Sequence, residues 1–220
     1  MGSKENYKYQ RIIVKAGTNI LTGGRDDLDD SFIDNLVSQI SDLSSSGREM
    51  LLVSSGAVAA GRGVMRNLSK SSVLPDRQVL AAVGQGRLMH LYEQAFATHG
   101  IPTAQALLSR RDVNDRLGYL NLRNTLLSLL NNGVVPVINE NDVVAVEELE
   151  GEVFGDNDTL SALVANLIDA DLLVILGSVE GMYTKDPNIF TDAELISVVE
   201  KMDDKLNEYA GPSSDLRGRG

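Results

Sequence analysis

Short, mostly apolar runs alternate along the chain with longer segments in which apolar residues recur every three or four positions. The short runs predict buried strands of a parallel sheet, because such strands are covered on both faces. They lie at residues 12–15, 50–53, 103–108, 134–138, 172–176 and 195–199. The periodic segments predict amphipathic helices, and they lie at 29–45, 78–98, 112–130 and 160–168. This alternation is typical of an α/β protein with a mainly parallel central sheet and helices on both faces.

Irregular segments connect these elements and limit the domain. The predicted connections are loops at 72–76 and 181–187, an acidic hairpin at 143–154 and a helical turn or two at 203–209. Residues 1–10 and 211–220 are polar and lack a periodic apolar pattern, so we expect flexible ends. The elements between them form one alternating series without an internal repeat. A single domain over residues 11–210 is therefore expected.

Small and polar residues follow the ends of several predicted strands. The candidate site residues are Lys15, Gly17 and Thr18 after the first strand, Ser55, Gly56 and Ala57 after the second, Asp142 after the fourth, and Asp156, Asn157 and Asp158 before the last long helix. In open parallel sheets, ligands bind outside the carboxyl ends of the strands. One capping side chain is enough to start a helix, so three polar residues in succession at 156–158 exceed that need. The pattern predicts a ligand site at one edge of the sheet.

Each of these features has a purely structural alternative. The glycines after residue 15 are compatible with a flexible connection, and the small residues at 54–63 with close helix packing. The turn at 156–158 is compatible with a capped helix and a solvated acidic turn. Gly84 and Gly86 lie inside a predicted helix, where either close packing or substrate approach would account for them. The recurrence of polar clusters at strand ends favours the ligand site.

A lysine fixed beside exposed backbone N–H groups can neutralise a phosphoryl group during transfer. Acidic and amide side chains can hold an amine or a magnesium-bound nucleotide. Together they predict phosphoryl transfer to a small polar acceptor. Metal-dependent hydrolysis is less favoured because no histidine accompanies the carboxylates. A serine nucleophile at Ser55 lacks the Gly-x-Ser-x-Gly elbow, and a Walker P-loop is absent from the sequence.

Composition narrows the choice of partners. A net charge of −11 without a local basic cluster disfavours nucleic acid, whose phosphates require a basic face. The sequence has no cysteine, which excludes thiol catalysis and disulfides and fits a cytoplasmic location. No window reaches the roughly 18 apolar residues of a membrane span. We expect a cytoplasmic protein that acts on small molecules and binds neither membranes nor nucleic acid.

Four motifs resemble those of the amino acid kinase family. They are Val14-Lys15-Ala16-Gly17-Thr18, Ser54-Ser55-Gly56-Ala57-Val58-Ala59-Ala60-Gly61, Val137-Ile138-Asn139-Glu140-Asn141-Asp142 and Phe154-Gly155-Asp156-Asn157-Asp158. The likeness extends from about residue 11 to about residue 187, and the last two motifs are similar to those of the members that phosphorylate glutamate. The resemblance implies a three-layer α/β/α sandwich. It also implies ATP-dependent phosphorylation of the γ-carboxylate of L-glutamate to glutamyl 5-phosphate, with Mg²⁺, as the first step of proline biosynthesis. A homo-oligomer inhibited by proline is implied as well.

The same resemblance implies roles for individual residues. Lys15 would contact the ATP phosphates, and Asp158 would orient Lys15 and a second lysine. The residues implied in glutamate binding are Ser55, Asp142 and Asn157, with Asp156 in support and the backbone around Gly56 and Ala57 assisting. Those implied at the nucleotide are Lys15, Gly17, Thr18, Gly177 and Ser178. No side chain is implied as a resident metal ligand.

Two departures from the family pattern define the expectations for this chain. Gly177-Ser178 replace the Thr-Asp pair that usually touches the nucleotide. The glycine-rich segment with the second catalytic lysine would lie beyond Gly220, and no C-terminal RNA-binding-like domain is expected here. The chain is thus expected to be C-terminally truncated and to turn over slowly by itself. The alternative hypothesis is a non-catalytic module that binds glutamate or proline and lacks the nucleotide half.

Overall fold

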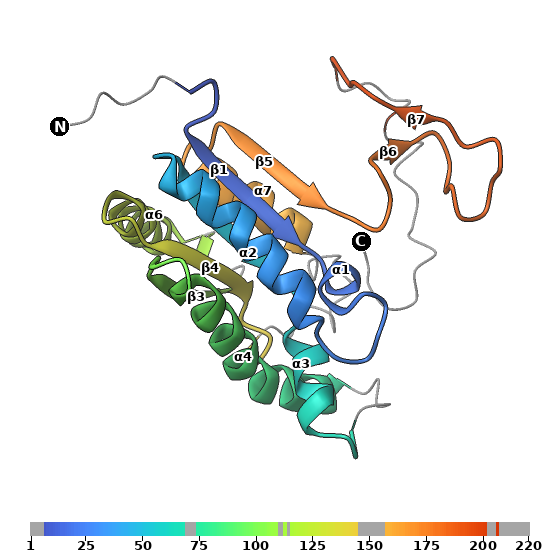
Figure 1. Cartoon of the computed structure of the whole chain (residues 1–220), viewed down its shortest axis with the longest axis horizontal. Helices are drawn as coiled ribbons and strands as arrows, with labels where there is room; N and C mark the ends of the chain where they lie inside the picture. The colour runs from blue at the N-terminus through green and yellow to red at the C-terminus, as the bar shows by residue number, and fades with distance from the viewer. Residues whose placement is uncertain are drawn as a thin grey trace.

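The computed structural model describes residues 7–68, 74–109, 112–113, 115–144, 157–201 and 206. Its central sheet has five parallel strands in the order β3-β4-β2-β1-β5 (Figure 1). They are β1 (Arg11–Ala16), β2 (Glu49–Ser54), β3 (Thr103–Leu108), β4 (Val135–Glu140) and β5 (Leu172–Leu176). Each coincides with a strand predicted from the apolar runs, within two residues at either end. The parallel α/β architecture is confirmed.

Helices cover both faces of this sheet. One face carries α1 (Thr18–Thr22), α2 (Asp30–Ser45), α3 (Ala57–Val64) and α4 (Leu74–Ala97), and the other carries α6 (Arg116–Asn131) and α7 (Asn157–Leu167). Successive strand residues point to opposite faces. Accordingly Ile12 and Val14 pack in the core beneath α2 and α4, whereas Ile13 packs in the core beneath α6 and α7. The predicted three-layer sandwich is therefore confirmed.

Several predicted boundaries were wrong. The glycine-rich segment after β1 contains the short helix α1, because Leu21 and Thr22 are buried there. Helix α4 already begins at Leu74, within the predicted loop 72–76, and α7 begins at Asn157 instead of residue 160. Helix α6 begins at Arg116, since the Asp115 side chain accepts a hydrogen bond from the backbone N–H of Gly118 at 2.7 Å and caps the helix.

The segment after β5 differs most from its prediction. The predicted loop at 181–187 contains β6 (Met182–Tyr183), which pairs antiparallel with β7 (Leu195–Ile196). The predicted strand 195–199 is thus only two residues long. Lys185 pairs with Asp192 inside this hairpin and also lies over the Phe190 ring. Figure 1 shows β6 and β7 standing apart from the central sheet.

Some expectations fall outside the described residues. These are Asp156, the predicted hairpin 143–154 except for its first two positions, the helical turn at 203–209 except for residue 206, and residues 1–6 and 211–220. Among the helices that the structure does describe, none is long and apolar enough to cross a membrane.

Two glycines bring α3 and α4 into close contact. A Cβ atom at Gly61 would lie 2.0 Å from the carbonyl oxygen of Leu80, and one at Gly84 would lie 1.9 Å from the carbonyl oxygen of Ala57. Neither position has room for a side chain. A Cβ atom at Gly86 would meet nothing within 4 Å. Close packing therefore accounts for Gly84 but not for Gly86, and it fixes α4 against the start of α3.

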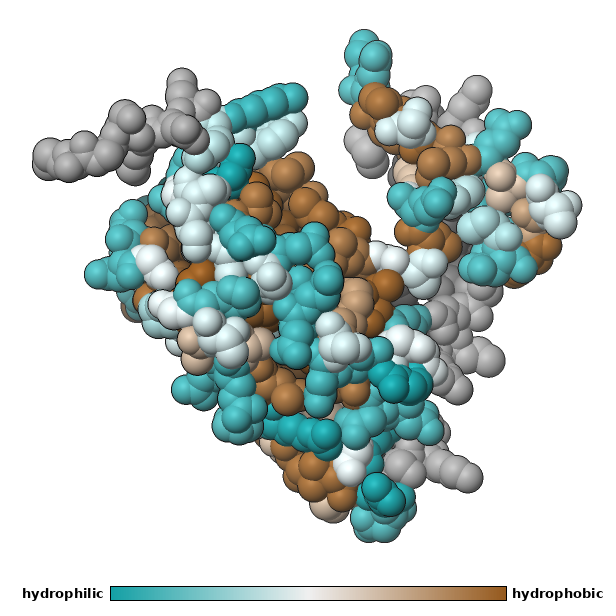
Figure 2. Space-filling model, viewed as in Figure 1, coloured by the Kyte–Doolittle hydropathy of each residue, from teal (hydrophilic) through white to brown (hydrophobic). Residues whose placement is uncertain are grey.

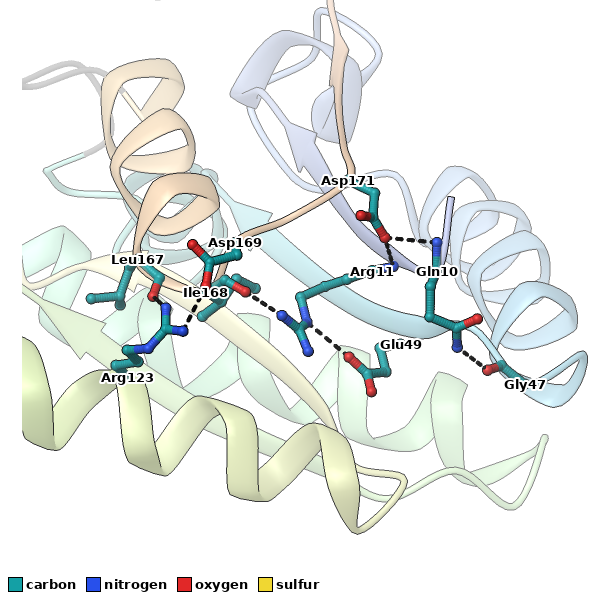
Figure 3. A network of polar contacts seen from close by, with 9 residues as sticks. All are labelled: Gln10, Arg11, Gly47, Glu49, Arg123, Leu167, Ile168, Asp169 and Asp171. Atoms are coloured by element: carbon teal, nitrogen blue, oxygen red, sulfur yellow. Dashed lines mark hydrogen bonds and ion pairs between the residues drawn. The ribbon is translucent and has the colours of Figure 1, made fainter. Parts of the chain in front are cut away.

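A polar network connects the elements at the amino-terminal edge of the sheet, opposite the strand ends that carry the candidate site residues (Figure 3). Arg123 donates to the carbonyl oxygen of Leu167, the last residue of α7, and Arg11 donates to that of Ile168, which follows it. Cations at a helix C-terminus satisfy its unpaired carbonyls and complement its dipole. Arg11 also pairs with Glu49 at 2.8 Å. The network thus fixes the axial position of α7, whose other end carries the candidate site residues.

Candidate functional site

Lys15 is placed by the alternation of β1. Val14 and Ala16 face the core beneath α2 and α4, so the Lys15 side chain points to the α7 side of the sheet. It is only 8% exposed, and its Nζ atom lies 2.5 Å from Oδ1 of Asp158 in the first turn of α7. A buried ammonium group needs a counter-charge to offset its desolvation. Asp158 provides that charge while remaining 31% exposed.

The turn after β1 leaves space for this ammonium group. A Cβ atom at Gly17 would lie 3.2 Å from Lys15 Nζ and 3.9 Å from the carbonyl oxygen of Leu176. The Lys15 side chain therefore curls over the backbone at Gly17, next to the end of β5. Thr18 follows as the first residue of α1. This places Lys15, Gly17 and Thr18 together at the carboxyl edge of β1 and β5.

Asn157 directly precedes Asp158 and makes a different set of contacts. Its Nδ2 atom donates to Ser55 Oγ at 2.7 Å and to Asn139 Oδ1 at 3.2 Å. Its Oδ1 atom is buried and has no hydrogen-bond partner among the described residues. A capped helix was the structural alternative to a ligand site at this turn, but Asn157 and Asp158 lie inside the first turn of α7. Their side chains instead connect α7 to β1, β2 and β4.

Ser55 lies in the turn between β2 and α3. Its backbone N–H donates to the carbonyl of Ala16 at 3.0 Å, which ties the turn to the end of β1. Gly56 has a φ of 100°, in the left-handed region that favours glycine. Ala57 then begins α3. The positive φ of Gly56 thus allows the chain to leave β2 and enter α3 immediately after Ser55.

A buried hydrogen bond between Ser54 and Tyr92 connects this turn to α4. Ser54 Oγ lies 2.9 Å from the Tyr92 hydroxyl of α4 and 2.9 Å from the Ser55 carbonyl oxygen. Both side chains are fully buried, and burial raises the pKa of the Tyr92 phenol. The phenol therefore stays neutral and can act as a hydrogen-bond donor or acceptor. Helix α4 is in this way attached to the backbone of the Ser55 turn.

The structure adds two residues that sequence analysis did not assign to the site, Asn139 and Gln85. Asn139 is 2% exposed at the end of β4, and its Nδ2 atom donates to Gln85 Oε1 on α4 at 2.8 Å. Asn139 carries a weak sequence signal, since it is a polar residue that ends an apolar strand. Gln85 carries none, because its role depends on how α4 packs beside β4.

The remaining predicted residues lie in the segments that follow β4 and β5. Asp142 is half-buried in the turn after β4, and Asn141 beside it donates to the Leu108 carbonyl at 2.8 Å. Gly177 and Ser178 follow β5, with Ser178 exposed. Asp156 lies outside the described residues. Among the residues described, no group of three or more His, Cys, Asp or Glu side chains is arranged to hold a metal ion.

Taken together, the carboxyl edges of β1, β2 and β4 and the start of α7 form one polar site. Lys15 and Asp158 supply a charged pair, and Asn157, Ser55 and Asn139 supply neutral donors and acceptors beside it. A fixed ammonium group can stabilise a transferring anionic group. The neighbouring amides and hydroxyl can orient a small polar molecule.

Comparison with known proteins places this chain in a family. Residues 10–213 match the amino acid kinase family. A glutamate 5-kinase from Dehalococcoides mccartyi is 51% identical over 214 residues, which cover 96% of this chain and 57% of that protein. Glutamate 5-kinases from Caldanaerobacter subterraneus and Methanosarcina barkeri are 50% and 45% identical, over 96% of this chain and 56% of each relative. The chain thus spans little more than half the length of these relatives. It belongs to the amino acid kinase family.

Proposed function

We propose that this chain carries the substrate-binding and phosphoryl-stabilising part of an ATP-dependent kinase that phosphorylates the γ-carboxylate of L-glutamate. The observation that carries the proposal is the contact between Lys15 Nζ and Asp158 Oδ1 at 2.5 Å, directly beside the Asn157–Ser55 hydrogen bond. A charged group suited to phosphoryl transfer therefore adjoins neutral groups suited to an amino acid. The resemblance to glutamate 5-kinases supports glutamate as that amino acid.

In this proposal the γ-carboxylate of glutamate attacks the γ-phosphorus of ATP, and ADP leaves with the electrons of the broken P–O bond. No general base is needed, because a carboxylate is already a nucleophile. Lys15 stabilises the charge on the transferring phosphoryl group, and Asp158 holds its ammonium in place. Mg²⁺ would arrive on the ATP phosphates, since Mg²⁺ in kinases is usually bound in part through them.

The proposal divides the other site residues between the two substrates. Ser55, Asp142 and Asn157 bind glutamate, assisted by Asp156 and by the backbone at Gly56 and Ala57. Gly17, Thr18, Gly177 and Ser178 adjoin the nucleotide. The product would be glutamyl 5-phosphate for proline synthesis in the cytoplasm. A homo-oligomeric state and inhibition by proline also belong to this proposal.

A glutamate- or proline-binding module without catalysis is the alternative. Both functions would use the Asn157–Ser55 side of the site. Only the kinase would use the buried ammonium group of Lys15. Even a paired buried charge usually stabilises a fold less than well-packed apolar residues would, so a module that only binds an amino acid would gain nothing from this pair. The Lys15–Asp158 pair therefore favours the kinase.

Trapping the acyl phosphate distinguishes the two functions. The chain would be incubated with glutamate, magnesium-ATP and hydroxylamine, and the acylhydroxamate measured. We expect slow formation, below the roughly 1 per second of ordinary enzymes, that depends on glutamate and is lost in Lys15→Ala. Glutamate binding with no more hydroxamate from the wild type than from Lys15→Ala would favour the binding module.

A further inference from the structure

The hydrogen bonds around Asn139 fix which atoms donate and which accept. The backbone N–H of Glu140 donates to Asn139 Oδ1 at 2.9 Å. A backbone N–H can only donate, so this atom of Asn139 must be the amide oxygen. The other amide atom is then Nδ2, which donates to Gln85 Oε1 at 2.8 Å. One backbone group thus determines the orientation of the Asn139 amide.

This orientation is passed on to the residues of the site. Because Asn139 Oδ1 is an acceptor, the Asn157 atom 3.2 Å away must be the donor Nδ2. The same Nδ2 atom donates to Ser55 Oγ at 2.7 Å. Ser55 Oγ therefore accepts this bond, and its own hydroxyl hydrogen is available for another acceptor. The Asn157 Oδ1 atom, buried and without a partner among the described residues, is an available acceptor.

A site with one free donor and one free acceptor matches an α-amino acid. Ser55 O–H can donate to a carboxylate, and Asn157 Oδ1 can accept from an ammonium group. If the Asn139 amide were reversed, Asn157 would have to reverse as well. Ser55 would then donate to Asn157 instead of to the ligand. The orientation of Asn139 consequently matters for binding although other residues offer the free groups.

We propose that Gln85 is a positioning residue for the amino acid substrate, because its Oε1 atom holds the Asn139 amide in the orientation that leaves Ser55 O–H and Asn157 Oδ1 free. Gln85 lies on α4, and close packing at Gly84 fixes this part of the helix against α3. The inference rests on the proposed glutamate-binding function. It adds a residue that acts through Asn139 and a defined hydrogen-bond direction for the site.

Substitutions of Gln85 show whether glutamate affinity depends on the direction of the hydrogen bond to Asn139 or on simple charge attraction. Gln85→Glu keeps an acceptor for Asn139 Nδ2, whereas Gln85→Lys places a donor against it. We expect the glutamate Kd of the full chain, measured by calorimetry, to stay within about threefold for Gln85→Glu and to rise about tenfold for Gln85→Lys, the scale of one lost hydrogen bond. If simple charge attraction decided the affinity, the acidic ligand would instead bind Gln85→Lys more tightly than Gln85→Glu.

Gln94→Glu and Gln94→Lys provide matched controls, because Gln94 lies on the exposed side of the same helix. Both should leave the Kd unchanged. If Gln85→Lys does not fold, Gln85→Met replaces it, with an expected rise of about fivefold. Equal affinities for Gln85→Met and the wild type, or weaker binding by Gln85→Glu than by Gln85→Lys, would overturn the role of Gln85. Absence of glutamate binding by the folded wild type would instead overturn the proposed function on which it rests.

Discussion

At the scale of residues, neighbours in the sequence contribute to the site in different ways. Asn157 and Asp158 are adjacent, yet one contacts Ser55 and the other contacts Lys15. Sequence analysis predicted all four as site residues, because each lies at the end of a strand or the start of a helix. It missed Gln85 and Asn139, whose contact joins α4 to β4 across 54 positions of the chain. Local pattern cannot predict such a contact, since it depends on helix packing.

Asp171, at the amino-terminal edge of the sheet, makes the stability of the fold depend on pH. Asp171 Oδ2 accepts hydrogen bonds from the backbone N–H groups of Arg11 and Gln10, each at 2.8 Å, and these bonds lower the pKa of the carboxyl group. A carboxyl pKa that is lower in the folded than in the unfolded chain stabilises the fold above the unfolded pKa, about 3.9 for aspartate. That contribution is lost as the pH falls through the folded pKa.

We therefore expect Asp171→Asn to reduce the acid sensitivity of the fold. Its amide oxygen can still accept hydrogen bonds but does not titrate, so stability at pH 7 should fall while the further loss toward pH 3 becomes smaller. Urea midpoints at the two pH values measure this difference. Asp34→Asn, at an exposed position of α2, is the control. An equal acid-induced loss in Asp171→Asn and the wild type would contradict the role of Asp171.

At the scale of elements, the contact between α3 and α4 fixes the Ser55 turn. Sequence analysis found Gly84 and Gly86 unusual inside a helix but could not separate packing from substrate approach, because the two glycines look alike in a sequence. The structure separates them. Gly84 faces the backbone of Ala57 and Gly61, whereas Gly86 faces open space. Helix boundaries were also hard to predict, since the first turn of α7 is polar and its side chains bind other elements instead of capping.

Alanine substitutions at these two glycines should have opposite effects on stability. Gly84→Ala places Cβ within 2.3 Å of the Gly61 nitrogen and 1.9 Å of the Ala57 oxygen, so the helices must separate. We expect a loss of about 3 kcal/mol in the free energy of unfolding. Gly86→Ala should instead add about 0.5–1 kcal/mol, because alanine restricts the unfolded chain and favours helix. Chemical denaturation measures both, and similar effects at the two positions would refute the packing assignment.

At the scale of the whole molecule, two kinds of surface differ clearly. The polar site occupies the carboxyl edge of the sheet, and an apolar band follows β5, the strand at one end of the strand order (Figure 2). None of the five β5 residues is fully buried, and Ile175 is 51% exposed. The alternating pattern predicted a covered parallel sheet. It did not predict the strand order, because hydrophobic periodicity gives no information about which strands are neighbours.

We propose that the site formed by β1, β2, β4 and α7 binds glutamate with its γ-carboxylate near Lys15. The most direct test is calorimetric titration of glutamate, with aspartate as control ligand, into the wild type and Asn157→Ala. Aspartate is one methylene shorter, a difference that binding sites resolve by about tenfold or more. We predict binding of one glutamate per chain, at least about tenfold weaker binding of aspartate, and about tenfold weaker glutamate binding by folded Asn157→Ala. Equal affinity for both ligands, or no effect of Asn157→Ala on glutamate binding, would contradict this claim.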